Sequence, residues 1–313
     1  MDETPQQEFR AGLMYGLIAY SCWGLVPLYF QQLAGVDLLE VLSHRIVWSL
    51  PLMLLLVACQ SRGFTALWRT LTTRKLVLAL AASSVFLTAN WLLYIYATST
   101  HRVAEASLGY FMLPLVNAVL ARVFLGEVLR PLHYPALALI LLGVFVPMLA
   151  KGELLWLPIA LPVTFGLYGL IRKTLPVDGS IGLTVETLLL SGPSWAYIAT
   201  RTFHGTGLVG VDANATFWFV FGGVVTVVPL LTFTLSVRRL PLLTQSFIQF
   251  ISPMVQIAVA VFLLHDEVSW DRWLALACVL AAVSVFIIDA VLKARTTQRI
   301  RRAEREAVGV GHD

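Results

Sequence analysis

A stripe of polar side chains interrupts one long apolar stretch of this sequence. Within residues 105–117, Ser107, Tyr110, Pro114 and Asn117 are separated by three, four and three positions, so they share one face of a helix. A second stretch nearer the C-terminus repeats this spacing. Its residues are Ser246, Gln249, Pro253 and Gln256. Polar groups inside membrane helices mark solute or ion pathways, so the doubled stripe predicts a duplicated membrane protein with a polar path between its halves.

Charged residues inside apolar stretches are the strongest candidates for chemistry, because a charge at the centre of a membrane helix costs about 2.5–3.5 kcal/mol. Arg45, beside His44, is predicted to face a cavity and to pair with an anionic solute or with Glu105. The alternative is that Arg45 extends its guanidinium to the lipid headgroups. Glu105 and Glu186 are the candidate proton carriers. The alternative for both is a carboxylate that stabilises the start of a helix.

Uncharged polar and aromatic side chains complete the candidate solute-binding site. They could line a cavity or stack against a planar solute, and the alternative is that they hold helices together. These residues are Trp23, Asn90, Tyr94, Tyr110, Asn117, Tyr168, Gln245, Gln249 and Gln256. Prolines inside the apolar segments are expected to bend or break their helices and so to permit alternating access. They are Pro27, Pro114, Pro229 and Pro253.

The elements that position these residues follow from composition. Hydrophobic residues make up 58% of the 313 residues and charged residues 13%, a balance typical of an all-α polytopic membrane protein. A membrane-spanning helix needs about 20 apolar residues. Ten segments meet this requirement: 12–33, 38–59, 75–97, 103–125, 132–150, 154–172, 181–201, 217–237, 241–264 and 270–292. The net charge of +4 does not indicate a nucleic-acid partner, because the basic residues lie between apolar runs and in the tail.

The basic residues also indicate how the segments cross the membrane. Cytoplasmic loops carry an excess of Lys and Arg. With a cytoplasmic N-terminus, the cytoplasmic ends and loops hold most of these residues, Arg172 and Lys173 among them. The opposite side holds Arg102, Lys151, Arg201 and Arg272. This distribution predicts that both termini are cytoplasmic.

Two halves of five segments each follow from the doubled stripe. The first repeat is predicted at residues 1–150, the second at 151–292, and a basic cytoplasmic tail at 293–313. Because five is odd, the second repeat enters the membrane from the opposite side. Ten transmembrane helices in two inverted-topology repeats are the architecture that lets a transporter alternate its access.

Several longer motifs resemble one known family. NWLLYIYA (90–97), EASLGYFMLPLVN (105–117), FLGE (124–127) and RLPLLTQSFIQFISP (239–253) are similar to the RarD-type branch of the EamA, or drug/metabolite transporter, superfamily. The resemblance implies ten helices, the bacterial inner membrane and export of a solute. The second copy of FLGE reads LHDE at 264–267, which departs from the superfamily pattern.

Other classes of function lack their signatures. The sequence contains no G-x-x-x-x-G-K-[ST] phosphate loop and neither H-E-x-x-H nor G-x-S-x-G, and no cofactor or metal site is predicted. An intramembrane enzyme would need a nucleophile beside a base, and neither Ser107 nor Ser191 has a histidine nearby in the sequence. Cys22, Cys59 and Cys278 are expected to be buried thiols.

These observations predict a secondary active transporter that exports a small organic solute or metabolite by alternating access, and not an enzyme. Its partners would be the solute and the lipid bilayer, with protons as a candidate coupling ion, and no nucleic acid. Both monomer and dimer stay open. The alternatives are a membrane channel, or a membrane interaction protein that transports nothing.

Overall fold

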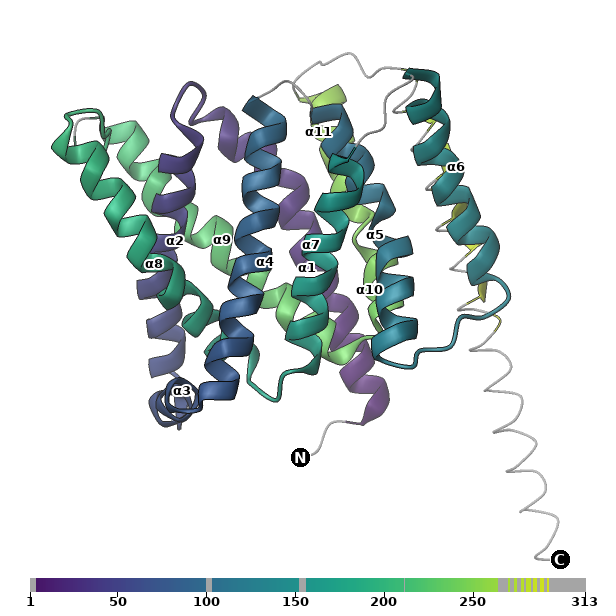
Figure 1. Ribbon diagram of the computed structural model, residues 1–313, viewed down its shortest axis with the longest axis horizontal. Helices are drawn as coiled ribbons and strands as arrows, with labels where there is room; N and C mark the ends of the chain where they lie inside the picture. The colour runs from purple at the N-terminus through teal and green to yellow at the C-terminus, as the bar shows by residue number, and fades with distance from the viewer. Residues whose placement is uncertain are drawn as a thin grey trace, which may run out of the picture. The chain divides into compact units, whose positions relative to one another are not determined.

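The computed structural model describes residues 4–99, 103–151, 156–210, 212–263 and 270, with isolated positions between 273 and 292. Within this part of the chain every regular element is a helix, as predicted. The helices (Figure 1) are α1 Pro5–Gln31, α2 Leu38–Ala58, α3 Gly63–Thr72, α4 Arg74–Ser99, α5 Val103–Phe124, α6 His133–Lys151, α7 Leu157–Thr174, α8 Gly179–Phe203, α9 Ala213–Arg239, α10 Leu242–Ile248 and α11 Ile251–Phe262.

Four of the described helices are long and apolar enough to cross a membrane. They comprise Gln6–Gln31, Leu38–Ala58, Arg74–Ala97 and Ala213–Arg239. Each of these ranges overlaps a predicted segment. The last predicted segment, 270–292, lies mostly outside the described residues. The finding agrees with an all-helical membrane protein.

Polar residues fix where several of these helices begin. The Asp37 carboxylate accepts a hydrogen bond from the Glu40 amide at 2.9 Å and caps α2. Asp178 accepts from the Ser180 amide at 2.9 Å and caps α8. Such caps satisfy amide groups that have no partner within the helix. Burial would raise the pKa of Asp178, but the hydrogen bonds from Ser180 and Ile181 and the nearby Arg238 together bring that pKa below its ordinary value.

The short helix α3 was not predicted from the sequence. Figure 1 shows it nearly end-on while α2 and α4 run up and down, so α3 lies across their ends. It packs against α2, α4 and α8, and its Phe64 and Trp68 side chains are 57% and 70% exposed. Aromatic groups exposed on a short amphipathic helix are typical of a helix that lies in the membrane interface.

The predicted segment 241–264 is not one helix. It is divided into α10 and α11 at Gln249 and Phe250. Pro253 lies in the first turn of α11, where its missing amide hydrogen costs no helical hydrogen bond. Pro27, Pro114 and Pro229, by contrast, lie within continuous helices. Of these prolines, Pro253 is the one beside an interruption of the regular helix.

The chain packs as two compact units. The first comprises Met1–Glu127 and Leu155–Val268, and the second comprises Val128–Leu154 and Ser269–Asp313. In the second unit Asp289 lies 2.6 Å from Nη1 of Arg130 and 3.3 Å from Nε2 of His133. The first unit contains every described helix except α6.

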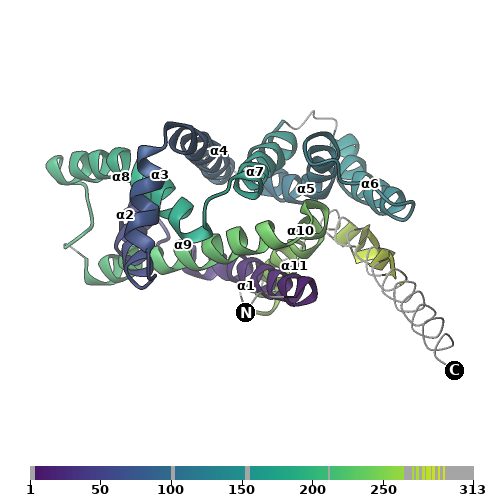
Figure 2. The same ribbon diagram turned by 90° about the horizontal axis from the view of Figure 1, so that it is seen from below.

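Helices of the first unit pack in matched pairs. Helix α1 packs against α9 and α11, while α7 packs against α4 and α5. Helix α2 packs against α9, while α8 packs against α4, and α2 and α8 contact each other. Figure 2 shows the same first-unit helices from below. The extensive packing is therefore between helices of the first and second predicted repeats.

The three cysteines are not uniformly buried. Cys22 and Cys278 are half-buried, but Cys59 is exposed. The prediction of a buried thiol was wrong for Cys59, because this residue caps the C-terminus of α2, where the chain leaves the helix bundle.

Two adjacent glycines let α9 approach α2 closely. A Cβ atom on Gly223 would lie 2.6 Å from the backbone oxygen of Trp48 in α2, and one on Gly222 would lie 2.9 Å from Cγ of Arg45 in α2. Both distances are too short for nonbonded atoms, so only glycine permits this spacing.

We expect Gly223→Ala to separate α2 from α9 and to lower the free energy of unfolding by about 1–3 kcal/mol, as overpacking of a core does. Thermal unfolding of the purified protein in detergent measures the effect. Gly192→Ala in α8 is the matched control, because a Cβ there meets nothing within 4 Å; it should leave the melting temperature unchanged or slightly higher. Equal behaviour of the two variants would contradict the close-approach argument.

Candidate solute-binding site

A small pocket lies between α2, α4, α8 and α9. All of its lining residues belong to the first compact unit, and both predicted repeats contribute. They are Ile46, Ser49, Leu87, Trp91, Leu183, Glu186, Thr187, Leu190, Thr226, Val227 and Leu230. The wall is apolar except for three hydroxyls, one indole and one carboxylate, a composition typical of small-molecule sites.

The hydroxyls of the wall are anchored to their own helices. Thr187 Oγ1 donates to the Leu183 carbonyl at 2.8 Å, and Thr226 Oγ1 donates to the Gly222 carbonyl at 2.8 Å. Each hydroxyl oxygen still has lone pairs that can accept a hydrogen bond. In Thr226 that capacity is used by Arg45.

Arg45 does not line this pocket itself but contacts two residues that do, Thr226 and Trp91. Its side chain is 8% exposed, and Nε donates to Thr226 Oγ1 at 2.9 Å. The guanidinium carbon is 5.7 Å from the ring centroids of both Phe30 and Trp91. Within the described part of the chain, no carboxylate lies within 4 Å of Arg45 and no hydrogen bond is made by Nη1 or Nη2.

Glu186 supplies the carboxylate of the pocket wall. Its Oε1 accepts a hydrogen bond from Ser83 Oγ and lies 3.7 Å from Nε of Arg172. Its Oε2 is buried without a hydrogen-bond partner in the described structure. Arg172 also donates from Nη2 to the Gly179 carbonyl at 2.9 Å. The resulting cluster of Ser83, Arg172 and Glu186 joins α4, α7 and α8.

Space for this cluster depends on a glycine. A Cβ on Gly182 would lie 1.9 Å from Nη1 of Arg172. The Arg172 and Glu186 side chains are 0% and 1% exposed, so their charges are held away from water. A buried pair of this kind is costly to break, because one charge is then left uncompensated.

Residues of the predicted polar stripe in α10 and α11 join helices outside the pocket. Gln249 Nε2 donates to the Tyr110 carbonyl at 3.2 Å, and Gln256 Nε2 donates to the Trp23 carbonyl at 3.3 Å. Gln245 donates to the Tyr20 hydroxyl at 3.3 Å. None of these residues lines the pocket. They link α10 and α11 to helices of the first predicted repeat.

The remaining predicted residues lie in the helix interfaces. Asn90 Nδ2 donates to the Leu161 carbonyl at 2.9 Å. The ring centroids of Tyr94 and Tyr110 are 6.2 Å apart. Asn117 is buried. The Glu105 side chain lies outside the described structure, so its predicted contact with Arg45 is not tested.

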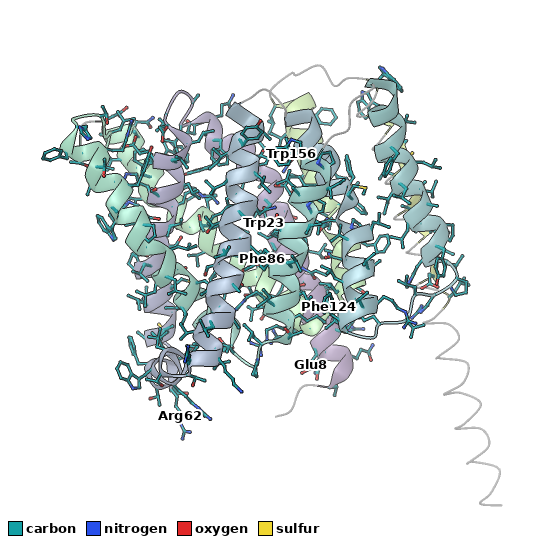
Figure 3. All side chains as sticks on the ribbon, viewed as in Figure 1. Glu8, Trp23, Arg62, Phe86, Phe124 and Trp156 are labelled. Carbon is teal, nitrogen blue, oxygen red and sulfur yellow. The ribbon has the colours of Figure 1, made fainter. Side chains whose placement is uncertain are left out.

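Trp23 and Tyr168 belong to an aromatic cluster. Tyr168 is stacked on Phe233 with ring centroids 5.7 Å apart, and Trp23 lies 5.7 Å from both Phe165 and Phe233. In Figure 3 Trp23 lies along the bundle between Trp156 and Glu8. The cluster joins α1, α7 and α9 beside the Arg172 end of the site.

Sequence reasoning missed most of the pocket wall. Ser49, Ser83, Thr187 and Thr226 look like ordinary small residues of membrane helices, and nothing in their spacing distinguishes them. Arg172 was counted as a residue of a cytoplasmic loop or helix end, but the structure buries it in an ion pair. The available signal was its spacing from Glu186, because a cation before one loop and a carboxylate after it can meet when the two helices pack.

Hydrogen bonds close the first unit at both ends of its helices. At one end Asp37 Oδ1 accepts from the Tyr197 hydroxyl at 2.7 Å. There Glu40 accepts from Arg201 Nη2 at 3.2 Å and from the Leu208 amide at 3.0 Å. We call these contacts the Asp37 latch. Burial would raise the pKa of Asp37, but Tyr197, Glu40 and Arg201 together lower that pKa. Its stabilising effect is therefore present above the ordinary unfolded pKa of about 3.9 and is lost as the pH falls through the lower folded value.

The other end is closed by contacts that we call the Lys173 latch. Lys173 Nζ donates to the carbonyls of Val237, at 3.1 Å, and Leu240. Arg238 donates to the Val177 carbonyl. Glu127 accepts from the Leu242 amide at 3.0 Å. These contacts tie the ends of α5, α7, α9 and α10 together.

The amino-acid sequence of this chain is similar to those of several known proteins. Residues 10–149 match the EamA-like transporter family. Protein RarD of Escherichia coli strain K12 is 34% identical over 294 residues, which cover 94% of this chain and 99% of that protein. Protein RarD of Salmonella typhi is 36% identical and is covered to 98%. An uncharacterized transporter of Vibrio cholerae is 34% identical and is covered to 99%.

A solved structure, titled only as the crystal structure of a protein, has the same fold. Its TM-score is 0.67 at 16% sequence identity, and the match covers 88% of this chain and 97% of that chain. At this identity the likeness concerns the fold alone.

The helices and these relatives define the class: this is a multi-pass membrane transporter. More particularly, the chain belongs to the RarD-type branch of the EamA-like transporter family. The family resemblance seen in the sequence is thereby confirmed. The names of the family and of its relatives are those of transporters, in agreement with the prediction that the chain is not an enzyme.

Breaking the Arg172–Glu186 pair should destabilise the protein. We expect Arg172→Met to cost about 3–5 kcal/mol of unfolding free energy, because it leaves the Glu186 carboxylate buried alone. Adding Glu186→Gln should restore much of this loss, so the double variant should be more stable than Arg172→Met. Chemical unfolding in detergent measures the cycle. The control Arg122→Met, at an exposed position of α5, should change stability little, and additive effects of the two single changes would refute the coupling.

Proposed function

We propose that this protein is a secondary active transporter that exports a small organic solute or metabolite across the bacterial inner membrane by alternating access. The proposal includes ten transmembrane helices in two inverted repeats and cytoplasmic N- and C-termini. The observation that carries it is the pocket enclosed by α2 and α4 of the first repeat and by α8 and α9 of the second. A site at the interface of two repeats is the usual place for the solute in such transporters.

The matched helix packing supports the inverted repeat. If the chain is two copies of five segments, α1 corresponds to α7, α2 to α8, α4 to α9, and α5 to α10 and α11. The contact of α1 with α9 then corresponds to that of α7 with α4, and the contact of α1 with α11 to that of α7 with α5. The α2–α8 contact corresponds to itself. This pattern is what a two-fold axis between the copies would produce.

The pocket follows the same relation. Leu87 and Trp91 of the first copy align with Thr226 and Leu230 of the second at the spacing set by the doubled polar stripe, and all four line the pocket. His44 aligns approximately with Glu186, and Arg45 with Thr187. The two copies therefore place corresponding positions around one cavity, while their side chains differ. The difference gives the cavity a cation beside it and a carboxylate in its wall.

The two latches and the break between α10 and α11 suggest how access alternates. Both the Asp37 latch and the Lys173 latch are formed in this structure, and each ties together helices that line the pocket or adjoin it. Opening one latch while the other holds would expose the pocket to one face of the membrane. The α10–α11 break provides a bending point near Gln249, where α10 joins α5.

Filling the pocket should stop transport. We expect Leu87→Trp, at a pocket position that is 1% exposed, to reduce solute flux at least tenfold, because the larger ring occupies the solute volume. The matched control on the same helix is Leu78→Trp, whose native side chain is 58% exposed. Proteoliposomes loaded with a cell metabolite extract, followed by mass spectrometry of the outside solution, give the flux. Thermal unfolding of both variants verifies that they are folded.

The outcomes of this experiment separate the alternatives. Saturable flux that Leu87→Trp abolishes and Leu78→Trp retains supports the proposal. Flux that never saturates favours a channel. If no solute crosses the bilayer with the unmodified protein, the transport proposal is wrong and a membrane interaction protein is favoured.

Proton coupling is a separate proposal that concerns Glu105 and Glu186. Transport driven by an imposed pH gradient should lose its pH dependence in Glu186→Gln or Glu105→Gln, since glutamine cannot release a proton. Proteoliposomes with identical solute gradients and opposite pH gradients measure the dependence. If both variants keep the pH dependence of the unmodified protein, neither residue carries the coupling proton.

A further inference from the structure

We infer that the solute is an organic monoanion with an apolar body and that Arg45 binds its anionic group. This inference rests on the proposed function, because it assigns the solute class of the same pocket. It begins from the balance of buried charges in the first compact unit.

The other buried charges of this region have partners. Glu40 is paired with Arg201 at 3.2 Å, and Glu186 with Arg172 at 3.7 Å. Arg45 is 8% exposed and has no carboxylate within ion-pair distance among the described residues. The guanidinium keeps its positive charge when buried, because arginine does not lose its proton in proteins. A buried charge without a counter-ion is costly, so the site gains stability when an anion binds beside Arg45.

The side chain of Arg45 is held in a binding geometry. Nε is fixed by Thr226, and the rings of Phe30 and Trp91 lie beside the guanidinium at 5.7 Å. The stem passes Gly222, where a Cβ would lie 2.9 Å from Cγ of Arg45. Among the described residues, Nη1 and Nη2 have no hydrogen-bond acceptor. Two parallel N–H donors on one guanidinium match the two oxygens of a carboxylate or phosphate group.

The pocket beside Arg45 determines the rest of the solute. Thr226 and Trp91 contact Arg45 and also line the pocket, so the anionic group and the cavity are adjacent. Most of the wall consists of leucine, isoleucine and valine, which suits an apolar body. Glu186 also lines the cavity, and its Oε2 has no partner. A second negative charge on the solute would be repelled there, which favours a monoanion over a dianion.

Binding in detergent tests this inference without requiring transport. The probes are hexanoate, its neutral amide hexanamide, and the six-carbon dianion adipate, with phenylacetate and phenylacetamide as a second matched pair. Each is titrated at pH 7.5 while the thermal unfolding of the full-length protein is recorded, because a ligand of the folded state raises its melting temperature. We expect at least one acid to bind at least tenfold more tightly than its amide, and hexanoate more tightly than adipate.

Variants assign the effect to Arg45. Arg45→Met should weaken binding of the acid at least tenfold, while Arg45→Lys, which keeps the charge but not the two parallel donors, should weaken it less. Arg122→Met removes an exposed cation from α5 and should leave binding unchanged. If Arg45→Met does not fold, the comparison of Arg45→Lys with Arg122→Met still tests the assignment.

Three results would overturn the inference: amides that bind as tightly as the acids, an acid affinity that survives Arg45→Met, or no acid-dependent stabilisation of the unmodified protein. The transport proposal fails independently. Acids that bind but do not cross proteoliposomes would leave the anion site standing without transport. Neutral solutes that cross while no acid binds would leave transport standing without the anion site.

Discussion

The constraint on which this structure depends is that buried charges and hydrogen-bonding groups must find partners inside the protein, because lipid supplies none. The cluster of Ser83, Arg172 and Glu186 meets part of this constraint, since Ser83 donates to Glu186 and Arg172 supplies its counter-charge, and it joins α4, α7 and α8. Ser236 does the same through the Gly12 carbonyl and the Gln245 side chain. Apolar contacts alone discriminate weakly between helix arrangements in lipid, where helix surfaces and lipid tails are equally apolar. The polar pairings therefore select which helices meet.

Internal pairing is incomplete at the candidate solute site. Nη1 and Nη2 of Arg45, both ring nitrogens of His44 and Oε2 of Glu186 have no hydrogen-bond partner in the described structure. Unmet hydrogen-bonding capacity is destabilising in an empty cavity and useful in a binding site, because a solute that supplies the missing partners gains their full strength in a dry environment. The pocket thus combines an apolar wall with a few unsatisfied polar groups.

The polar stripe shows how sequence reasoning from periodicity succeeds and where it stops. Helical spacing predicts that Gln249 and Gln256 share one face and point toward the interior of the protein. An inward face, however, can meet either a neighbouring helix or a cavity, and spacing cannot distinguish them. In the structure these amides donate to the backbone carbonyls of Tyr110 and Trp23. They join helices, while most of the pocket wall is aliphatic and its three hydroxyls, from Ser49, Thr187 and Thr226, carry no distinctive sequence signal.

The sequence by itself determined the helical membrane class and the approximate bounds of most helices, because hydropathy and helix caps depend on residues within one segment. It also determined the family, because family motifs are short runs of consecutive residues. Tertiary structure decided the pocket, the burial of Arg172 and the division between α10 and α11. These depend on which side chains from distant segments meet. A glycine pair on α9, for example, sets the approach of α2, and that approach places Arg45 against Thr226. Such contacts join residues far apart in the chain, so no local pattern contains them.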